Sequence, residues 1–486
     1  MTWLAVIGVL LWWTTGVCIV LAAWPKRTDS LRWYGAIAAL GWLVGTSLAS
    51  MVYFGLRCVA VPSVGMLVLV DLIVLIAAGG AMRAMRSRRQ IIEVNVAAPT
   101  LTPRLKQFGG LVRCLVCWAA PWAIIAIAAV LWHKPHGPRD AWAQWNVKAK
   151  FMHAAGDLWQ QHIVNLGAAE NPDYPLLLPA TVARTWHYLG APVTHPQVFP
   201  GPGSVAMLFA IATGVLLFGT LLMLRRQLQA CIAALAVVGT WAFVDQAGWQ
   251  YADVPVGAYM LATCACVVLW RHFGESGRGL LALAAFCALS AAWTKNEGIV
   301  FCVAMVIGAA AVRLYLCYGL RSALPAGQAI PRPDSLQPNR TWAFVVTALV
   351  IVVPVLCLVL VRLRLQMVSD ALDRLSFESL GERLTDGARY KLIAAGAWSA
   401  VIQSPMYALV AVYAVVAGRD RNHSYRRVAS VFFIAAAIML LAYVALCLLT
   451  TYDPALYVTL TIHRVLLQLW PATLLMTFLV IRHAED

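Results

Sequence analysis

The chain has 486 residues, of which 62% are hydrophobic and only 12% are charged, and its formal net charge is +16. A water-facing surface needs far more charge than this, so the composition excludes a soluble globular protein. Such a positive charge would suggest nucleic acid in a soluble chain, but here the basic residues cluster between apolar runs. We therefore interpret the charge as a sign of membrane orientation and expect no nucleic-acid partner.

Apolar runs recur along the chain at close to the length of about twenty residues that crosses a hydrocarbon core. They predict an all-α fold, a polytopic transmembrane helical bundle of about thirteen spans in the cell inner membrane. The first run, Trp3 to Ala23, lacks a basic n-region and a clear cleavage site, so we interpret it as a retained helix and not as a signal peptide. The expected spans are 2–24, 34–56, 58–82, 110–132, 203–224, 230–244, 255–270, 279–294, 298–318, 342–361, 391–417, 429–450 and 464–481.

Basic residues fall in alternate connections between these spans, and the positive-inside rule makes that side cytoplasmic. This side holds Lys26, Arg27, Arg83, Arg86, Arg88, Arg89, Arg225, Arg226, Arg271, Arg278, the stretch 319–341, Arg419, Arg421, Arg426 and Arg427. The opposite side receives the segments 133–202, 245–253, 295–297, 362–390 and 451–464. We expect the functional residues there. We divide the chain into N-terminal transmembrane helices with a basic cytoplasmic loop, 1–108, and a catalytic transmembrane region, 109–486.

Cysteine and histidine give no clear metal motif. Nearly all of the twelve cysteines lie inside apolar runs, where they act as small core residues. Cys114 and Cys117 form a CxxC, but it lies within a span and has no second pair nearby. His187, His195 and Asp173 match no short ligand spacing, so no cofactor is certain, although a divalent metal stays possible.

The long segment 133–202 mixes carboxylates, aromatic rings, amides and cations, which a simple connector does not need. Asp140 follows the fourth span, where it could accept a proton from a hydroxyl; the alternative is that it caps the next helix. The spacing of Ala141 to Ala155 predicts a helix with Trp142, Trp145 and Ala149 on one face. These tryptophans would stack on a sugar or form an interfacial belt. The candidate substrate-binding residues of this segment are Trp142, Trp145, Lys148, Asp173 and Tyr174.

Further polar groups lie at the membrane boundary. Asp245 and Asp253 flank Gln250 and Tyr251 between two apolar runs, where an unpaired charge is costly, so they indicate a site or a cation partner. Lys295 and Glu297 follow at the end of another span. Lys295 would neutralise an acidic partner, contact a phosphate, or simply snorkel to the interface.

The last polar group is His463 and Arg464, where the final span is expected to begin. Gln468 lies one turn further on the same helix face as Arg464. Arginine holds a phosphate or carboxylate by two parallel hydrogen bonds, and a phospholipid headgroup would satisfy it equally well. The chain has no GxxxxGK[ST], GxGxxG, HExxH or GxSxG motif, which argues against a nucleotide-driven pump, a zinc protease and a serine hydrolase.

These motifs together resemble those of bacterial polytopic glycosyltransferases of the GT-C superfamily. The resemblance rests on Asp140 in DAWAQWNVKAKF, followed by PDYPLLLP, QYADVP, TKNEG and a terminal HRVLLQLWP, and covers residues 110–475. The similar proteins are relatives of the dolichyl-phosphate-mannose protein mannosyltransferases and of the aminoarabinose transferase that modifies lipid A.

The resemblance implies transfer of a sugar from a polyprenyl-phosphate donor to a lipid, glycan or protein acceptor on the outer face of the inner membrane. It implies that Asp140 is the catalytic base and that Asp253 is a second acidic position that shapes the catalytic site. From charge and sidedness we expect Lys295 and Arg464 to bind the carrier phosphate.

Two other classes of function stay open. A polytopic transporter or lipid flippase of envelope precursors would place charges near the midplane and show paired broken helices. The sequence has few charges deep in spans apart from Asp71, and no evident repeat. A structural or polymerising partner in envelope assembly, similar to an O-antigen ligase, would also use an outer loop and a carrier lipid.

Overall fold

The computed structural model describes residues 3–25, 33–87, 103–167, 170–190, 200–322, 356, 359–360, 380–420, 425–451 and 453–482. Within these ranges the chain is helical and contains no β-strand, apart from one isolated bridge between Arg419 and Ile481. The prediction of an all-α, multi-pass membrane bundle is confirmed for the described residues.

The described residues form a series of helices. In chain order they are α1 (Trp3–Ala23), α2 (Tyr34–Val59), α3 (Val64–Ser87), α4 (Pro103–His133), η2 (Ala141–Asn146), α5 (Val147–Ala154), η3 (Gly156–Leu158), α6 (Trp159–Val164), α7 (Leu177–Leu189), α8 (Pro200–Leu224), α9 (Gln227–Val238), α10 (Trp241–Gly248), α11 (Asp253–Phe273), η6 (Gly274–Gly277), α12 (Arg278–Thr294), α13 (Asn296–Ser322), α16 (Leu380–Thr385), α17 (Gly387–Gln403), α18 (Met406–Ala417), α19 (Arg426–Leu449) and α20 (Pro454–Val480).

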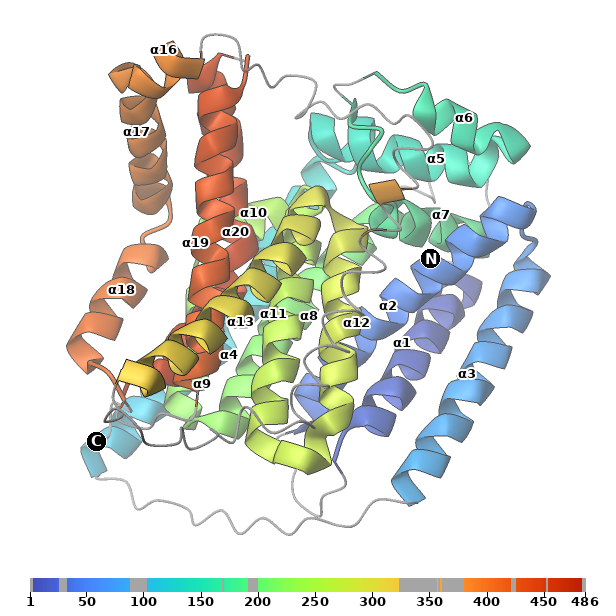
Figure 1. The fold of residues 1–486 in the computed structure, drawn as a ribbon. Coiled ribbons are helices and arrows are strands. Elements are labelled where there is room, and N and C mark those ends of the chain that lie inside the picture. The colour runs from blue at the N-terminus through green and yellow to red at the C-terminus, as the bar shows by residue number, and fades with distance from the viewer. Residues whose placement is uncertain are drawn as a thin grey trace.

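Nine helical stretches of the described residues are long and apolar enough to cross a membrane, or up to eleven if each of two bent helix pairs is one span. One of the nine, Asp253–Thr294, comprises α11 and α12, which pack side by side and are joined by the short turn η6 (Figure 1). The expected span 342–361 lies almost entirely outside the described residues. The expected total of about thirteen spans therefore stays a prediction.

Other expectations also fall on residues that the structure does not describe. These are Lys26, Arg27, Arg88, Arg89, His195, Arg421, most of 319–341 and all of 362–379.

The helix α11 lies at the centre of the bundle, and nearly all its side chains are buried. Figure 1 shows α1, α2 and α3 on one side of it and α17 and α18 at the opposite edge. The short helices α5, α6 and α7 lie across one end of the bundle, so the long segment 133–202 is largely helical, as its sequence predicts.

The turn η6 and the connection between α8 and α9, which carry Arg278 and Arg225 at their ends, lie at the other end of the bundle (Figure 1). Trp24 after α1 and Trp33 before α2 pack against Phe273, the last residue of α11. Arg225 after α8 pairs with Asp420 after α18 at 2.8 Å. These contacts tie together connections that the sequence predicts to lie on one side of the membrane.

Two expected spans are broken. Residues 230–244 form α9 and α10, which meet at a bend of 58°, and residues 391–417 form α17 and α18, which meet at a bend of 84°. The second break falls at Ser404 and Pro405, because a proline has no N–H to continue the helical hydrogen bonds. Asp245, expected in a loop, lies inside α10.

The expected loop 451–464 is also wrong, because the chain is helical from Pro454 onward. Asp453 accepts a hydrogen bond from the N–H of Ala455 at 3.0 Å, which caps the helix, and Pro454 is well suited to the first helical position. Arg464 is therefore not at the start of α20 but about three turns inside it.

Glycines allow close helix contacts at two points that shape the bundle. A Cβ atom at Gly16 would lie 1.9 Å from the carbonyl oxygen of Gly41, so α1 and α2 approach this closely only with glycine there. A Cβ atom at Gly298 would lie 2.0 Å from the carbonyl oxygen of Ala291. This contact holds the first turn of α13 against α12.

Asp71, the carboxylate that the sequence places deep in a span, has partners. It pairs with Arg184 of α7 and accepts a hydrogen bond from Nε1 of Trp12 at 3.0 Å. The guanidinium carbon of Arg184 lies 4.5 Å from the ring centre of Trp12. The pair links α3 to α1 and α7, and it avoids the high cost of a lone buried charge.

Candidate functional site

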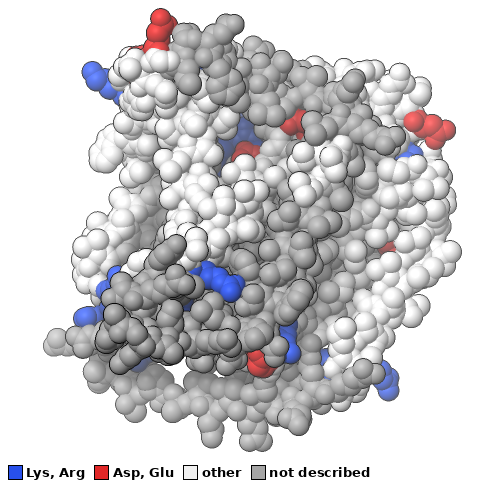
Figure 2. Space-filling view, in the orientation of Figure 1, with Lys and Arg blue, Asp and Glu red and all other residues white. Residues whose placement is uncertain are grey.

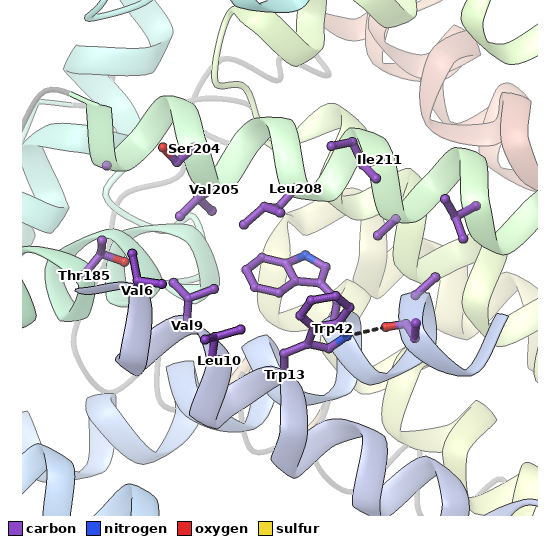
Figure 3. A pocket seen from close by; sticks show the side chains of 15 residues that line it. Val6, Val9, Leu10, Trp13, Trp42, Thr185, Ser204, Val205, Leu208 and Ile211 are labelled. Atoms are coloured by element: carbon purple, nitrogen blue, oxygen red, sulfur yellow. Dashed lines mark hydrogen bonds between the residues drawn. The ribbon is translucent and has the colours of Figure 1, made fainter. Parts of the chain in front are cut away.

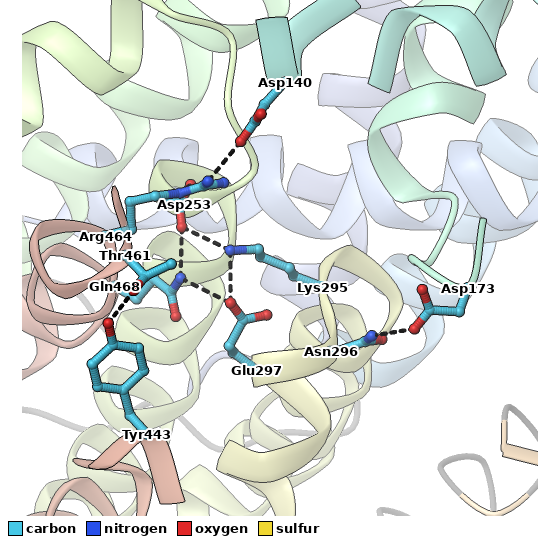
Figure 4. A network of polar contacts seen from close by, with 10 residues as sticks. All are labelled: Asp140, Asp173, Asp253, Lys295, Asn296, Glu297, Tyr443, Thr461, Arg464 and Gln468. Atoms are coloured by element: carbon cyan, nitrogen blue, oxygen red, sulfur yellow. Dashed lines mark hydrogen bonds and ion pairs between the residues drawn. The ribbon is translucent and has the colours of Figure 1, made fainter. Parts of the chain in front are cut away.

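Asp253 is the first residue of α11, and its side chain is completely buried. Its Oδ1 accepts hydrogen bonds from Nζ of Lys295 at 2.9 Å and from Nε2 of Gln468 at 2.6 Å. Its Oδ2 accepts one from Nε of Arg464 at 3.0 Å (Figure 4). A buried carboxylate is tolerated only with such partners, so Asp253 organises the two cations around itself.

Arg464 joins Asp253 to Asp140. Its Nη1 donates to Oδ2 of Asp140 at 2.6 Å, and its guanidinium carbon lies 4.8 Å from the ring centre of Tyr251. The side chain is 15% exposed, and no hydrogen bond or ion pair within the described part of the chain uses its Nη2. One amino group of the guanidinium is therefore free to bind a ligand.

Lys295 lies at the junction of α12 and α13 and is held by two carboxylates. Besides Asp253, its Nζ contacts Oε1 of Glu297 at 2.7 Å, and the side chain is only 3% exposed. Gln468 reaches the same Glu297 oxygen at 3.5 Å. Lys295 therefore neutralises acidic partners, and it does not snorkel to an interface.

The segment between α6 and α7 reaches the same cluster. Nδ2 of Asn296 donates to Oδ2 of Asp173 at 2.6 Å. Tyr174 stacks on Trp145 with ring centres 5.3 Å apart, and Nζ of Lys148 lies 5.6 Å from the Tyr174 ring centre. These contacts fix the long segment 133–202 against the start of α13.

Gln250 holds the loop that carries Asp140. Its Nε2 donates to the carbonyl oxygen of Pro135 at 3.0 Å, and its Oε1 accepts from Nδ2 of Asn146 at 3.2 Å. Pro135 and Asn146 lie on either side of Asp140 in the chain, and Gln250 lies three residues before Asp253. The amide therefore fixes the distance between the two carboxylates.

Two residues of the site have left-handed backbone, which is uncommon outside glycine. They are Asn171, with φ 48°, and Gln250, with φ 61°. The carbonyl oxygen of Asn171 accepts a hydrogen bond from the buried Lys148. Backbone strain of this kind is concentrated at functional sites, where the surrounding contacts maintain it.

Two tyrosines of the cluster are held in their protonated form. Burial raises the pKa of Tyr174 well above its usual value, and the negative charge of Glu297 raises it further. Burial raises the pKa of Tyr251 in the same way, with a contribution from Asp140. Both hydroxyl groups are therefore hydrogen-bond donors at neutral pH.

The cluster is open to solvent on one side. The exposed fractions of the Arg464, Asp140 and Glu297 side chains are 15%, 25% and 29%, whereas Asp253 is completely buried. Figure 2 shows basic and acidic atoms together in a recess in the upper part of the molecule. The cluster thus has a buried part around Asp253 and a solvent-accessible edge at Asp140 and Glu297.

Most of the predicted site residues meet in this cluster and its supporting shell. They are Asp140, Trp145, Lys148, Asp173, Tyr174, Gln250, Tyr251, Asp253, Lys295, Glu297 and Arg464. His463 does not join them within the described contacts, because neighbours on a helix point about 100° apart.

Trp142 does not share a face with Trp145. Trp145 and Ala149 are buried, but Trp142 is 53% exposed. The segment begins with the π-helix η2, whose turn is wider than that of an α-helix, so the expected face is lost there. Asp140 precedes η2 but makes no capping hydrogen bond with its side chain, which contacts Arg464 instead.

No role was predicted for Asn146 and Asn296, although each forms a hydrogen bond with a site residue. Amide side chains in polar loops follow no characteristic sequence spacing. Their role can therefore be recognised only from their contacts in the structure. Gln468 could be predicted, because it lies four residues after Arg464 on the same helix face.

A separate apolar cavity of about 350 Å³ lies between α1, α2 and α8 (Figure 3). Its walls are almost entirely apolar and include Leu10, Trp42 and Ile211. Nε1 of Trp13 donates to the carbonyl oxygen of Ala38 beside it. Such walls suit a hydrocarbon chain and not polar chemistry, so we assign the candidate site to the charged cluster.

Within the described part of the chain, no group of three or more His, Cys, Asp or Glu side chains is arranged to hold a metal ion. His187 lies beside His153, with 2.9 Å between their Nδ1 atoms, whereas Asp173 lies beside Asn296. The predicted candidates His187 and Asp173 are therefore not gathered around one point.

No protein-family model matches the chain, and comparisons with curated proteins and with solved structures find no match.

Proposed function

We propose that the chain is a membrane glycosyltransferase of GT-C-like architecture that moves a sugar from a polyprenyl-phosphate donor to an acceptor on the outer face of the inner membrane. One observation carries the proposal. Arg464 contacts both Asp140 and Asp253, and Asp253 contacts Lys295, so four segments far apart in the chain form one charged cluster.

Asp140 is suited to act as the general base. Its Oδ2 contacts Arg464, no described contact uses its Oδ1, and the side chain is 25% exposed. The acceptor hydroxyl oxygen forms a bond to the anomeric carbon of the donor sugar and gives its proton to Asp140. The bond between that carbon and the phosphate oxygen breaks, and the phosphate leaves with the electron pair.

Arg464 is suited to bind the leaving phosphate. Its Nη2 takes part in no described contact, while Nε and Nη1 are held by Asp253 and Asp140. A guanidinium fixed in this way stabilises the charge that develops on the phosphate without having to reorganise. Lys295 adds positive charge, but it is 3% exposed, so it acts at longer range. Asp253 positions both cations, and being buried it does not contact the substrate.

The position of the cluster suits a lipid-linked donor. Asp253 begins α11, and Lys295 lies at the junction of α12 and α13, so both lie at helix ends. The turn η6 and the connection between α8 and α9 lie at the opposite end of the bundle (Figure 1). A donor bound here would keep its prenyl chain in hydrocarbon, and the helices α5 to α7 would face the acceptor.

The test is an in vitro assay of the purified full chain with a panel of polyprenyl-phosphate sugars, in which wild type is compared with Asp140→Asn. We expect turnover with at least one donor and a loss of about 10²- to 10⁴-fold in Asp140→Asn. The matched control is Asp157→Asn, because Asp157 is an exposed carboxylate of the same loop region. If Asp140→Asn is as active as the control, Asp140 is not the base.

A transporter or flippase of envelope precursors is the second candidate, and the broken helices favour it. The two breaks lie close together: a Cβ atom at Gly239, beside the first break, would lie 3.4 Å from Met406, beside the second. However, the residues at the breaks, including Thr240 and Ser404, carry no charge. The discriminating assay is movement of a polyprenyl-phosphate sugar across proteoliposomes without acceptor. Flux that survives Asp140→Asn would favour the transporter.

A further inference from the structure

Two carboxylate oxygens of the cluster have no hydrogen-bond partner within the described part of the chain. They are Oδ1 of Asp173 and Oε2 of Glu297, and both atoms are buried. The other oxygen of each carboxylate is held: Asn296 donates to Oδ2 of Asp173 at 2.6 Å, and Lys295 contacts Oε1 of Glu297 at 2.7 Å. Neither free oxygen can turn to another partner without breaking these contacts.

The two carboxylates flank one residue, Asn296. Glu297 follows it in the first turn of α13, and Asp173 is hydrogen-bonded to its side chain. Figure 4 shows Asp173, Asn296 and Glu297 on the opposite side of Lys295 from Asp140. The free acceptors therefore lie across the cluster from the proposed base.

The chemistry of these oxygens restricts what can bind there. A carboxylate only accepts hydrogen bonds, and a buried acceptor without a donor is unfavourable, so a ligand at this position must donate. A phosphate is excluded, because its negative charge would be repelled by both carboxylates. The phosphate of a donor is thus directed to Nη2 of Arg464, and its sugar ring to Asp173 and Glu297.

We infer that Oδ1 of Asp173 and Oε2 of Glu297 accept hydrogen bonds from two hydroxyl groups of the transferred sugar and so select donors that carry both hydroxyls. The inference rests on the proposed glycosyltransferase function and deepens it. The exposed fraction of Asp173 is only 5%, so this side chain is held in place by its neighbours. The hydrogen-bond acceptor is therefore preformed and does not depend on a mobile surface side chain. A preformed acceptor discriminates strongly against a ligand that lacks the matching donor.

The experiment uses the full chain in nanodiscs and the polyprenyl-phosphate sugar that wild type transfers best. Each ring hydroxyl is replaced in turn by hydrogen, and kcat/KM is measured for wild type, Asp173→Asn and Glu297→Gln. In each variant the new amide oxygen would keep the contact with Asn296 or with Lys295. The amide N–H group would then take the place of the unpaired carboxylate oxygen, and a donor would replace an acceptor. Glu382→Gln is the control for Glu297→Gln, because Glu382 is an exposed carboxylate of α16.

We expect kcat/KM of wild type to fall about 10- to 100-fold for two of the deoxy donors. In Asp173→Asn the ratio of parent to deoxy donor should fall to near 1 at one of these positions, and in Glu297→Gln at the other. Glu382→Gln should keep both ratios. A structural role would lower kcat/KM for all donors equally and leave the ratios unchanged, which would overturn the inference.

Two further outcomes separate this inference from the proposed function. If an amine in place of one hydroxyl raises kcat/KM in wild type and Asp173→Asn removes that gain, the carboxylates select an ammonium group, and the hydroxyl assignment is wrong. If wild type transfers no sugar from any donor of the panel, the proposed function fails and this inference fails with it.

Discussion

Nη1 of Arg464 lies 2.6 Å from Oδ2 of Asp140, although 324 residues separate the two in the chain. Arg464 is three turns inside α20, and Asp140 immediately precedes η2. Since Nε of the same guanidinium contacts Asp253, its orientation is fixed at two points. The free Nη2 therefore has a defined direction, and the proposed function depends on it.

Arg464→Lys should lower kcat/KM by about 10²-fold, because an ammonium group cannot hold two carboxylates in a planar fork and also bind a phosphate. The measurement is steady-state kinetics with the active donor, with thermal unfolding in detergent as the check on folding. Full activity in Arg464→Lys would show that only a positive charge is needed there.

Asp253→Asn should destabilise the protein by about 3–5 kcal/mol, because it leaves Lys295 and Arg464 without the carboxylate that pairs with them. Unfolding by denaturant in detergent measures the change. The control is Glu275→Gln, whose carboxylate is 68% exposed and pairs only with Arg278 in the contacts described; we expect a change below about 0.5 kcal/mol. Equal effects of the two substitutions would contradict the buried network.

Gln250 tests the positioning of Asp140. Gln250→Gly and Gln250→Ala both remove the side-chain bonds to Pro135 and Asn146, but only glycine adopts φ 61° without strain. We expect Gln250→Ala to be less stable than Gln250→Gly by about 1 kcal/mol. Both should lower kcat and leave KM for the donor nearly unchanged. A change confined to KM would instead indicate direct contact of Gln250 with the donor.

The sequence predicted the helical, multi-pass fold because its apolar runs are long and regular. We did not predict the two broken spans: Pro405 marks the second one in the sequence, whereas the bend beside Gly239 has no such local signal. Most residues of the cluster were also predictable, because charged residues are rare in this chain. A charged group at the end of a span is costly unless it is paired or belongs to a site. Nothing in the sequence, however, showed that Asp253 is buried and Asp140 is at the edge. That difference follows from α11 lying at the centre of the bundle.

Trp142 and Trp145 show a second limit of the sequence. Their spacing fits one α-helical face, but the π-helix η2 separates them, so one ring is buried and the other exposed. A local change in helix type of this kind leaves no signal in hydrophobic periodicity.

His187 should make the stability of the protein pH-dependent. Burial, helped by the neighbouring His153 and by the positive charges of Arg57 and Arg184, lowers the pKa of His187 to about 4. In the unfolded chain this pKa is near 6.5, so the unfolded state takes up a proton first as pH falls. Stability should therefore decrease between about pH 6.5 and pH 4, by up to about 3 kcal/mol. Thermal unfolding of wild type and His187→Gln over this range measures it; parallel curves would contradict the prediction.

The orientation of the bundle predicts opposite labelling of its two ends. A cysteine in place of Asp157, beside α6, should react with an impermeant thiol reagent in intact cells, and one in place of Glu275, in η6, should not. Both positions are exposed, so access depends only on the side of the membrane. The labelling of each variant is compared with that of wild type, because the native cysteines can also react with the reagent. The reverse pattern would place the cluster on the cytoplasmic side.

The most direct measurement is a cryo-EM structure of the full chain in nanodiscs with a polyprenyl-phosphonate sugar, a donor analogue that cannot react. We predict a phosphonate oxygen about 2.7–2.9 Å from Nη2 of Arg464, with the sugar between Asp140 and Glu297. An analogue bound away from Arg464, or a map in which Asp140 and Arg464 do not meet, would contradict the account.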